Sequence, residues 1–244
     1  MHIIKLDAIG STNTFLKDFV VNGLVENFTV VTAEEQFSGR GQMGAKWHSK
    51  RGENLMFSIF VAFDEFFLKD FTFLNYAVSL AIYEVIKEYE IFKLQIKWPN
   101  DIMSGNKKIG GVLIENVLNK DKIKHSIIGV GLNVNQTDFP KELGVASSLK
   151  TILNKNINRE HLLNKLVESI KQKIELCVSS NFDLIKSEYL SVLYKKDIPT
   201  MFKDSEDKMF LGKIKNISSL GLLQVELEDE SIKEFNIKEI SFFL

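Results

Sequence analysis

Residues 94–118 read LQIKWPNDIMSGNKKIGGVLIENVL, two β-rich runs on either side of a short polar turn. Because Ser-Gly-Asn is typical of turns, the runs 94–103 and 108–118 predict a β-hairpin. Pro99 lies inside the first run, where it removes a ladder donor and indicates a bulge or a sheet edge. A third β-rich run, 125–135, follows the turn NKDK. Three consecutive strands therefore predict a meander.

The segments around this hairpin predict further strands and helices. Strands are expected at 2–9, 28–35 and 54–63, and helices at 10–23, about 66–90 and about 159–194. The first helix is expected to have Ser11 or Thr12 as its N-cap and to stop at Gly23. After Lys196 the pattern changes to short alternating strands. The fold class is therefore α+β: a mixed or antiparallel sheet flanked by helices over 1–196, and a small β-barrel domain over 197–244.

The composition argues against several classes of protein. The 244 residues carry 31 Lys+Arg and 32 Asp+Glu, a net charge of −1 that argues against nucleic-acid binding. Cys177 is the single cysteine, so an intrachain disulfide is excluded, and the four scattered histidines make no zinc pattern. The sequence shows no signal peptide and no run of about 18 apolar residues. We expect a soluble, cytoplasmic protein with no membrane partner.

A long loop at 34–55, EEQFSGRGQMGAKWHSKRGENL, separates two apolar runs. Compact proteins rarely keep such a loop without a use for it. Glycine lets backbone N–H groups approach a ligand closely, and the guanidinium of Arg40 suits phosphate or carboxylate. Trp47 could cover a flat ligand. Taken alone, the loop is as consistent with a structural role as with a binding site.

The turn of the hairpin carries groups suited to anion and metal chemistry. Asn100 and Asp101 form an oxygen-bearing pair that could hold Mg²⁺ with its waters. Lys108 follows Asp101 by seven residues, and the hairpin can return it to the same end. An ordinary hairpin with solvated lysines at its tip is the alternative interpretation.

Two shorter patterns point the same way. Gly129, Gly131 and Asn133 alternate along one predicted strand and so share a face. Glycines there leave room for a flat group against the sheet, although close packing explains them equally well. The sequence Ser-Thr-Asn at 11–13 is at minimum a helix cap, and its free N–H groups could also face a ligand.

Together these motifs, in this order, resemble the signature series of biotin protein ligases. The series is STN, Q-x-x-GRG-x-x-G-x-x-W, KWPND, K-I-GG-x-L-x-E and G-x-GLN-x-N, and it runs from Ser11 to Asn135. The resemblance implies a class II synthetase-like catalytic domain and a small SH3-like C-terminal barrel. It also implies a two-step reaction. Biotin and MgATP give biotinyl-5′-adenylate, and the acyl group then passes to a lysine of a biotin carboxyl carrier protein.

The resemblance assigns roles to individual residues. For biotin binding they are Ser11, Thr12, Asn13, Gln36, Gly39, Arg40, Gly41, Gln42, Lys108, Gly111, Gly129 and Gly131. For ATP and the adenylate they are Arg40, Gly41, Gln42, Trp47, Lys97, Asn100, Asp101, Lys108 and Asn133. Catalysis falls to Lys108, Arg40 and Asp101, and Asp101 is also the candidate ligand of Mg²⁺. A homodimer is left open.

The sequence departs from the family pattern at two points. Related loops often read Gly-Arg-Gly-Arg-x-Gly-Arg, whereas the second and third arginines are Gln42 and Ala45 here. We hypothesise that Gln42 latches the loop less tightly and lets the adenylate leave faster. Some relatives also carry an N-terminal DNA-binding domain. Because the first predicted strand begins within three residues of Met1, we expect a monofunctional type without that domain.

Two other functions remain open at this stage. A lipoate–protein ligase shares the implied architecture and adenylate chemistry, but its loop resembles Arg-Arg-x-Gly-Gly-Gly. A non-catalytic biotin- or nucleotide-binding module would need no charged centre, yet Arg40, Lys97, Asp101 and Lys108 are all present.

Overall fold

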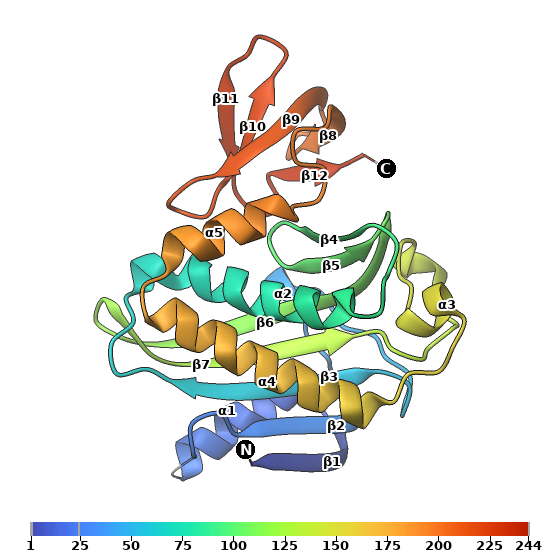
Figure 1. Ribbon diagram of the computed structural model, residues 1–244, viewed down its shortest axis with the longest axis vertical. Helices are drawn as coiled ribbons and strands as arrows, with labels where there is room; N and C mark the ends of the chain where they lie inside the picture. The colour runs from blue at the N-terminus through green and yellow to red at the C-terminus, as the bar shows by residue number, and fades with distance from the viewer. Residues whose placement is uncertain (1, 24, 244) are drawn as a thin grey trace.

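A seven-stranded sheet forms the larger part of the molecule (Figure 1). The computed structural model describes residues 2–23 and 25–243, so Met1, Leu24 and Leu244 lie outside the described residues. The strand order is β1 (Ile3–Ile9), β2 (Val30–Gln36), β3 (Leu55–Ala62), β7 (Lys122–Leu132), β6 (Lys107–Asn119), β5 (Asp101–Ser104) and β4 (Leu94–Lys97). β1 and β2 pair in parallel, whereas all other neighbours are antiparallel.

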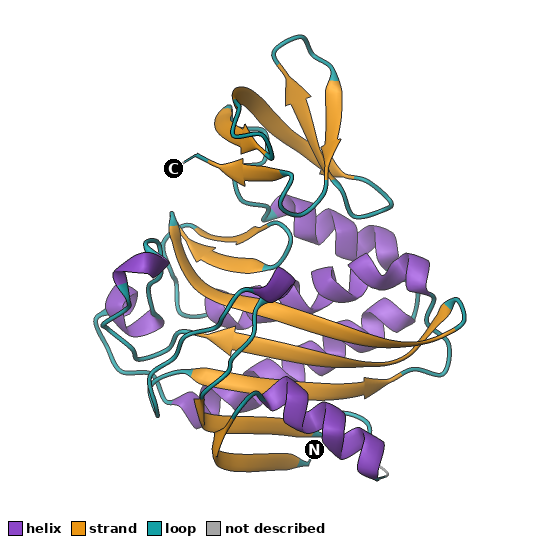
Figure 2. Ribbon diagram, turned by 180° about the vertical axis from the view of Figure 1, so that it is seen from behind, coloured by secondary structure: helices purple, strands orange, loops and turns teal. Residues whose placement is uncertain are grey.

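Helices cover both faces of this sheet. α2 (Phe71–Lys87), α4 (Arg159–Val178) and α5 (Phe182–Ser191) pack on one face over the main apolar core. α1 (Thr12–Asn22) lies on the opposite face, where Leu16 packs with Val31, Phe60 and Ile127 (Figure 2). α1 also supplies the crossover that the parallel β1–β2 pair requires. A short helix, α3 (Leu149–Leu153), follows β7.

The predicted meander is present, but its first run and the last predicted helix are each divided. Residues 94–103 form two antiparallel strands, β4 and β5, joined by the turn Trp98-Pro99-Asn100. Pro99 thus lies in the turn that follows β4, the edge strand of the sheet, so the expectation of a sheet edge is confirmed and that of a bulge within one strand is wrong. The helix predicted over 159–194 is interrupted after Val178, where Ser180 adopts a left-handed conformation with φ of 62°. Short polar residues at 179–181 favour such a helix end over continuation.

Residues near the C-terminus form a second, antiparallel sheet of five strands. Its order is β11 (Ile232–Phe235), β10 (Leu223–Leu227), β9 (Met209–Ile217), β8 (Thr200–Asp204) and β12 (Ile240–Phe242), so β11 and β12 stand at its two ends. Side-chain hydrogen bonds join it to the larger part. Trp98 Nε1 donates to Gly221 O at 3.2 Å, and Lys238 Nζ donates to Met43 O at 3.0 Å. The domain boundary near Lys196 stays a prediction.

Candidate active site

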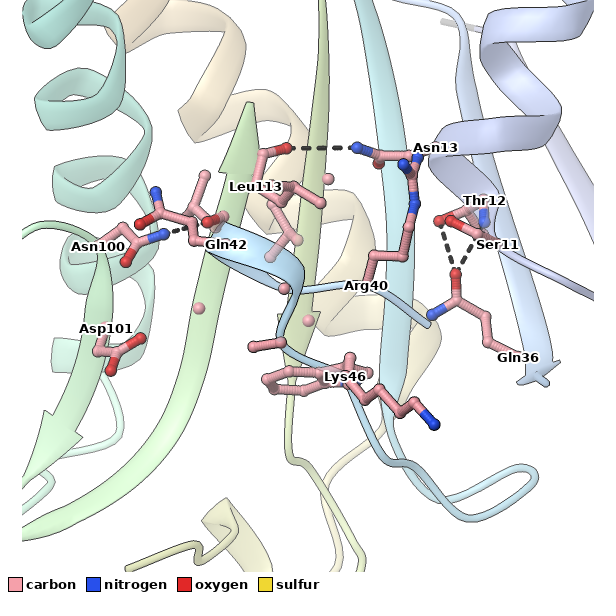
Figure 3. A pocket seen from close by; sticks show the side chains of 18 of the residues that line it. Ser11, Thr12, Asn13, Gln36, Arg40, Gln42, Lys46, Asn100, Asp101 and Leu113 are labelled. Atoms are coloured by element: carbon pink, nitrogen blue, oxygen red, sulfur yellow. Dashed lines mark hydrogen bonds between the residues drawn. The ribbon is translucent and has the colours of Figure 1, made fainter. Parts of the chain in front are cut away.

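A cavity of about 240 Å³ lies on the face of the large sheet that α1 covers. Its walls come from the start of α1, the loop 37–54 between β2 and β3, the Trp98–Asn100 turn, and strands β6 and β7 (Figure 3). It brings together most of the predicted site residues: Ser11, Thr12, Asn13, Gln36, Arg40, Gly41, Gln42, Trp47, Asn100, Asp101, Lys108, Gly111, Gly129 and Gly131. Segments far apart in the sequence therefore converge on one hollow.

Three predicted residues lie beside this cavity instead of lining it. Gly39 is buried in the loop and lines a second hollow, here called the outer hollow, which Arg40 also lines. Lys97 Nζ stands 4.6 Å from the ring centre of Phe242, and burial lowers the pKa of this lysine, with Asp101 opposing the shift. Asn133 is buried and donates through Nδ2 to Ser147 O at 2.9 Å. It follows the last residue of β7, and its backbone N still donates to Ile109 O of β6 at 2.8 Å.

Lys108 and Asp101 form an ion pair at the floor of the cavity. Lys108 Nζ lies 2.5 Å from Asp101 Oδ1. A register shift in the β5–β6 pairing places Lys108 opposite Met103 while Gly111 stands opposite Asp101, and such a bulge redirects a side chain. The pair lies directly over Gly111, where a Cβ would make an ordinary van der Waals contact with Lys108 Nζ at 3.5 Å. The strand geometry therefore fixes a cation in the cavity.

The Trp98–Asn100 turn beside this pair is held from several directions. Pro99 O accepts hydrogen bonds from Asn75 Nδ2 and from the Tyr189 hydroxyl, each at 2.9 Å. The side-chain amide of Asn100 donates to Val112 O. With the bond from Trp98 to Gly221, both sheets contribute to the position of the turn.

The opposite end of the cavity is polar, and the side chain of Ser11 at this end makes no capping hydrogen bond. Thr12 donates to Gln36 Oε1 from its backbone N at 2.8 Å and from its hydroxyl at 3.1 Å. Ser11 occupies the N-cap position of α1 as expected. Ser11 is only 6% exposed and lines the cavity, so its hydroxyl is positioned to meet a ligand.

The space expected over the strand glycines is already filled by side chains. A Cβ on Gly131 would lie 2.5 Å from the indole of Trp47, and one on Gly129 would collide with the amide of Asn13. The glycines therefore admit Trp47 and Asn13 against the sheet, which is the close-packing interpretation of this pattern; a role for them in ligand binding stays a prediction. Trp47 Nε1 is buried and finds no hydrogen-bond partner among residues 2–23 and 25–243.

The segment of the chain that supplies this cavity matches a known family. The chain matches the biotin/lipoate A/B protein ligase family over residues 6–133. It belongs to that family.

Individual relatives of this family member align over nearly the whole chain. It is 31% identical to the bifunctional ligase/repressor BirA of Bacillus subtilis, over 98% of this chain and 73% of that protein. It is 27% identical to the BirA of Escherichia coli over the same shares. Its fold is similar to a biotin protein ligase from Aquifex aeolicus in complex with biotin and ATP, with a TM-score of 0.80 and 29% identity. That similarity covers 99% of this chain and 98% of the other.

The candidate metal ligand of this family member, Asp101, lines the cavity. Within the described residues, 2–23 and 25–243, no three His, Cys, Asp or Glu side chains gather where they could hold a metal ion. Asp101 is the carboxylate at the cavity floor, and it already faces Lys108. Nucleotide-associated Mg²⁺ commonly uses one or two carboxylates together with substrate phosphates and water. Asp101 therefore fits a metal ion that arrives with a nucleotide.

Several contributors to the site were not predicted. The additional lining residues are Ala45, Lys46, Pro99, Val112, Leu113 and Val130, each inside or next to a quoted motif. Ser58 Oγ lies 2.8 Å from Thr12 Oγ1 and 2.6 Å from Asn13 Oδ1. Glu115 binds both Arg40 and Asn13. The last residue of the motif K-I-GG-x-L-x-E was the available signal for Glu115, whereas nothing in the strand 54–63 singled out Ser58.

Proposed function

We propose that this chain is a biotin–protein ligase. It activates biotin with ATP to biotinyl-5′-adenylate and transfers the biotinyl group to a lysine of a biotin carboxyl carrier protein. The observation that carries the proposal is the fixed Lys108–Asp101 pair in a cavity with a polar end, in a fold similar to a ligase described with biotin and ATP. The acceptor protein and a cytoplasmic location are parts of the same proposal. The structure describes no helix long and apolar enough to cross a membrane within 2–23 and 25–243.

In the first step Lys108 brings two anions together. The biotin carboxylate is ionised at neutral pH, so no general base is needed. A carboxylate oxygen attacks the α-phosphorus of ATP, the bond to the bridging oxygen breaks, and pyrophosphate leaves. The ammonium of Lys108 offsets the repulsion between the carboxylate and the phosphate and the charge that develops during the attack. Its fixed position matters because positioning and charge neutralisation supply most of the catalysis in such reactions.

The polar end of the cavity is suited to the ureido head of biotin. Ser11 offers a hydroxyl on the cavity wall, and Gln36 offers an amide that already accepts from Thr12. A buried ureido group must have its donors and acceptors paired. We assign Ser11, Thr12, Asn13 and Gln36 to this head, and Arg40, Trp47 and Asn100 to the nucleotide side. Lys97 and Asn133 do not line the cavity, so we assign them a supporting role through the residues that do.

In the second step the acceptor lysine must be neutral before its amine can attack. The amine nitrogen forms a bond to the carbonyl carbon of the mixed anhydride, and AMP leaves with the anhydride oxygen. We assign Asp101 to orient this amine or to take its proton. Its present partner, Lys108, would then remain near the departing phosphate.

Pyrophosphate exchange tests the proposal directly. We expect ATP–pyrophosphate exchange that depends on biotin and does not occur with lipoate, followed by transfer of biotin to a carrier-domain lysine. Exchange driven by lipoate would favour a lipoate–protein ligase instead. Binding of biotin without exchange would favour a non-catalytic module and overturn the proposed function.

A further inference from the structure

Arg40 stands between two hollows, and Glu115 holds it from the outer one. Arg40 lines both the main cavity and the outer hollow, which has a volume of about 510 Å³, whereas Glu115 lines the outer hollow alone. Arg40 Nη2 donates to Glu115 Oε2 at 2.9 Å. Glu115 therefore holds the guanidinium without itself lining the candidate ligand site.

The same carboxylate oxygen also fixes a residue of the cavity wall. Asn13 Nδ2 donates to Glu115 Oε2 at 2.8 Å, and Asn13 Oδ1 lies 2.6 Å from Ser58 Oγ. These contacts give the Asn13 amide a donor end and an acceptor end, and so fix its orientation over Gly129. Arg40 and Asn13 lie side by side in Figure 3. One oxygen of Glu115 thus ties the loop to the start of α1.

The loop around Arg40 depends on a few such contacts. Met43 is 59% exposed, and the backbone of this segment bonds mostly to itself, as Gly41 N to Ala45 O at 2.7 Å and Trp47 N to Gly39 O at 2.9 Å. Two contacts come from outside the loop: Glu115 accepts a hydrogen bond from Arg40, and Lys238 donates one to Met43 O. Removing the Arg40–Glu115 contact should therefore loosen the loop more than the sheet beneath it.

The geometry leaves Arg40 able to bind a ligand while it is held. A guanidinium has five N–H donors, and Glu115 takes a single terminal nitrogen of Arg40. The remaining donors are available to an anion in the main cavity. Holding the guanidinium in advance reduces the conformational entropy that binding would otherwise cost.

We propose that Glu115 is a positioning residue that keeps Arg40 and its loop closed over the cavity and thereby slows the escape of biotin and its adenylate. This inference rests on the proposed ligase function. Glu115 touches no reacting atom and acts through Arg40, with Asn13 as a secondary partner.

Release rates test this role. Biotin release from the purified chain is measured by stopped-flow displacement, for wild type, Glu115→Ala and Glu115→Gln, with thermal unfolding as a check of folding. Exposed ion pairs contribute up to about 1 kcal/mol, so we expect Glu115→Ala to release biotin up to about fivefold faster. Glu115→Gln should fall between, because its amide oxygen still accepts from Arg40 and Asn13. Glu160→Gln, which loses a pair with Lys5 at the surface, is the matched control and should match wild type.

A double-mutant cycle separates positioning from a general structural effect. If Glu115 acts through Arg40, Glu115→Ala should change the free energy of activation for biotin release less when Arg40 is already alanine. We expect half or less of the change that Glu115→Ala causes in the wild-type background. Equal effects in both backgrounds would overturn the proposal, as would unchanged or slower release in folded Glu115→Ala. Slower release would mean that Glu115 competes with the ligand for Arg40. Biotin binding is read here without any catalytic step, so a wild type that binds biotin but exchanges no pyrophosphate would refute the ligase function while leaving the loop measurement valid.

Discussion

Lys108 and Arg40 are cations of the same cavity, yet the chain holds them in different ways. Lys108 lies in β6, where its backbone N donates to Val145 O at 2.8 Å and its carbonyl accepts from Ser147 N at 2.9 Å. Arg40 lies in a loop whose nearest regular structure is the single 3₁₀ turn Gln42–Gly44, and its guanidinium is held by a side chain. The difference indicates a division of work. We infer that the sheet supplies a charge that stays in place during the reaction and that the loop supplies one that can open and close.

The largest effect should come from removing the fixed charge. We expect Lys108→Ala to keep its fold and lose about 10²–10³-fold in biotin-dependent pyrophosphate exchange, because one pre-positioned electrostatic contact is lost. The measurement is the exchange rate at saturating biotin and ATP. Lys107→Ala, on the adjacent exposed residue of the same hairpin, is the control and should behave as wild type. Normal exchange in Lys108→Ala would show that the reaction does not need the charge that the sheet holds in place.

A second change tests whether the loop needs the glycine on β7. The Cβ of Gly131→Ala would overlap the Trp47 indole, and such overpacking typically costs about 1–3 kcal/mol. We expect the indole to be displaced and the KM for ATP to rise about tenfold or more. Gly23→Ala is the control, because a Cβ at that position meets nothing within 4 Å. An unchanged KM in Gly131→Ala would show that Trp47 does not line the nucleotide position.

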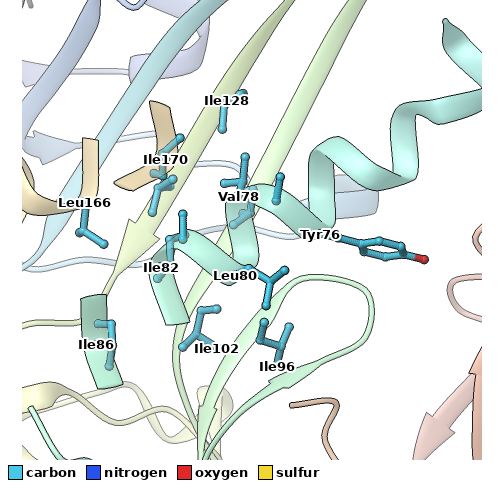
Figure 4. Close-up of a cluster of buried hydrophobic side chains, with 14 of the residues drawn as sticks. Tyr76, Val78, Leu80, Ile82, Ile86, Ile96, Ile102, Ile128, Leu166 and Ile170 are labelled. Carbon is cyan, nitrogen blue, oxygen red and sulfur yellow. The ribbon is translucent and has the colours of Figure 1, made fainter. Parts of the chain in front are cut away.

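Two stacked tyrosines test how firmly the turn beside the sheet site is held. Tyr76 and Tyr189 have ring centres 4.3 Å apart and are 3% and 0% exposed. The Tyr189 hydroxyl donates to Pro99 O, whereas that of Tyr76 points away from the aliphatic cluster in Figure 4 and has no partner within residues 2–23 and 25–243. Removing a buried hydrogen bond costs about 1 kcal/mol, and removing an unpaired hydroxyl does not.

We therefore expect Tyr189→Phe to lower the free energy of unfolding by about 1 kcal/mol and Tyr76→Phe to leave it unchanged or raise it. Urea unfolding of the two variants measures this difference on the same ring stack. Equal losses would mean that the contact with Pro99 O does not hold the turn.

Local sequence signals predicted the two halves of the site unequally. Alternating apolar runs and the turn Ser-Gly-Asn were enough for the β5–β6–β7 meander, because strand period and turn chemistry are local. The strand break at Pro99 and the helix break at Ser180 were missed, since apolar spacing continues across both. Arg40 meets Glu115 across 75 residues of sequence. No local pattern encodes such a contact, so the residues that fasten the loop appeared only with the fold.

The smallest expected effect concerns the loop and its residue Gln42, which lines both the main cavity and the cleft that includes Trp98 and Pro99. Gln42→Arg adds a charge that can meet the adenylate phosphate, and a partly exposed contact of this kind contributes up to about 1 kcal/mol. We expect adenylate release to slow by up to about fivefold, measured in single-turnover reactions without acceptor protein. Met43→Arg adds the same charge at an exposed neighbour and should leave the rate unchanged. Equal rates of adenylate release from wild type and Gln42→Arg would contradict the hypothesis that Gln42 weakens retention of the adenylate. Retention would then depend on Arg40 and Glu115 rather than on the second position of the glycine-rich motif.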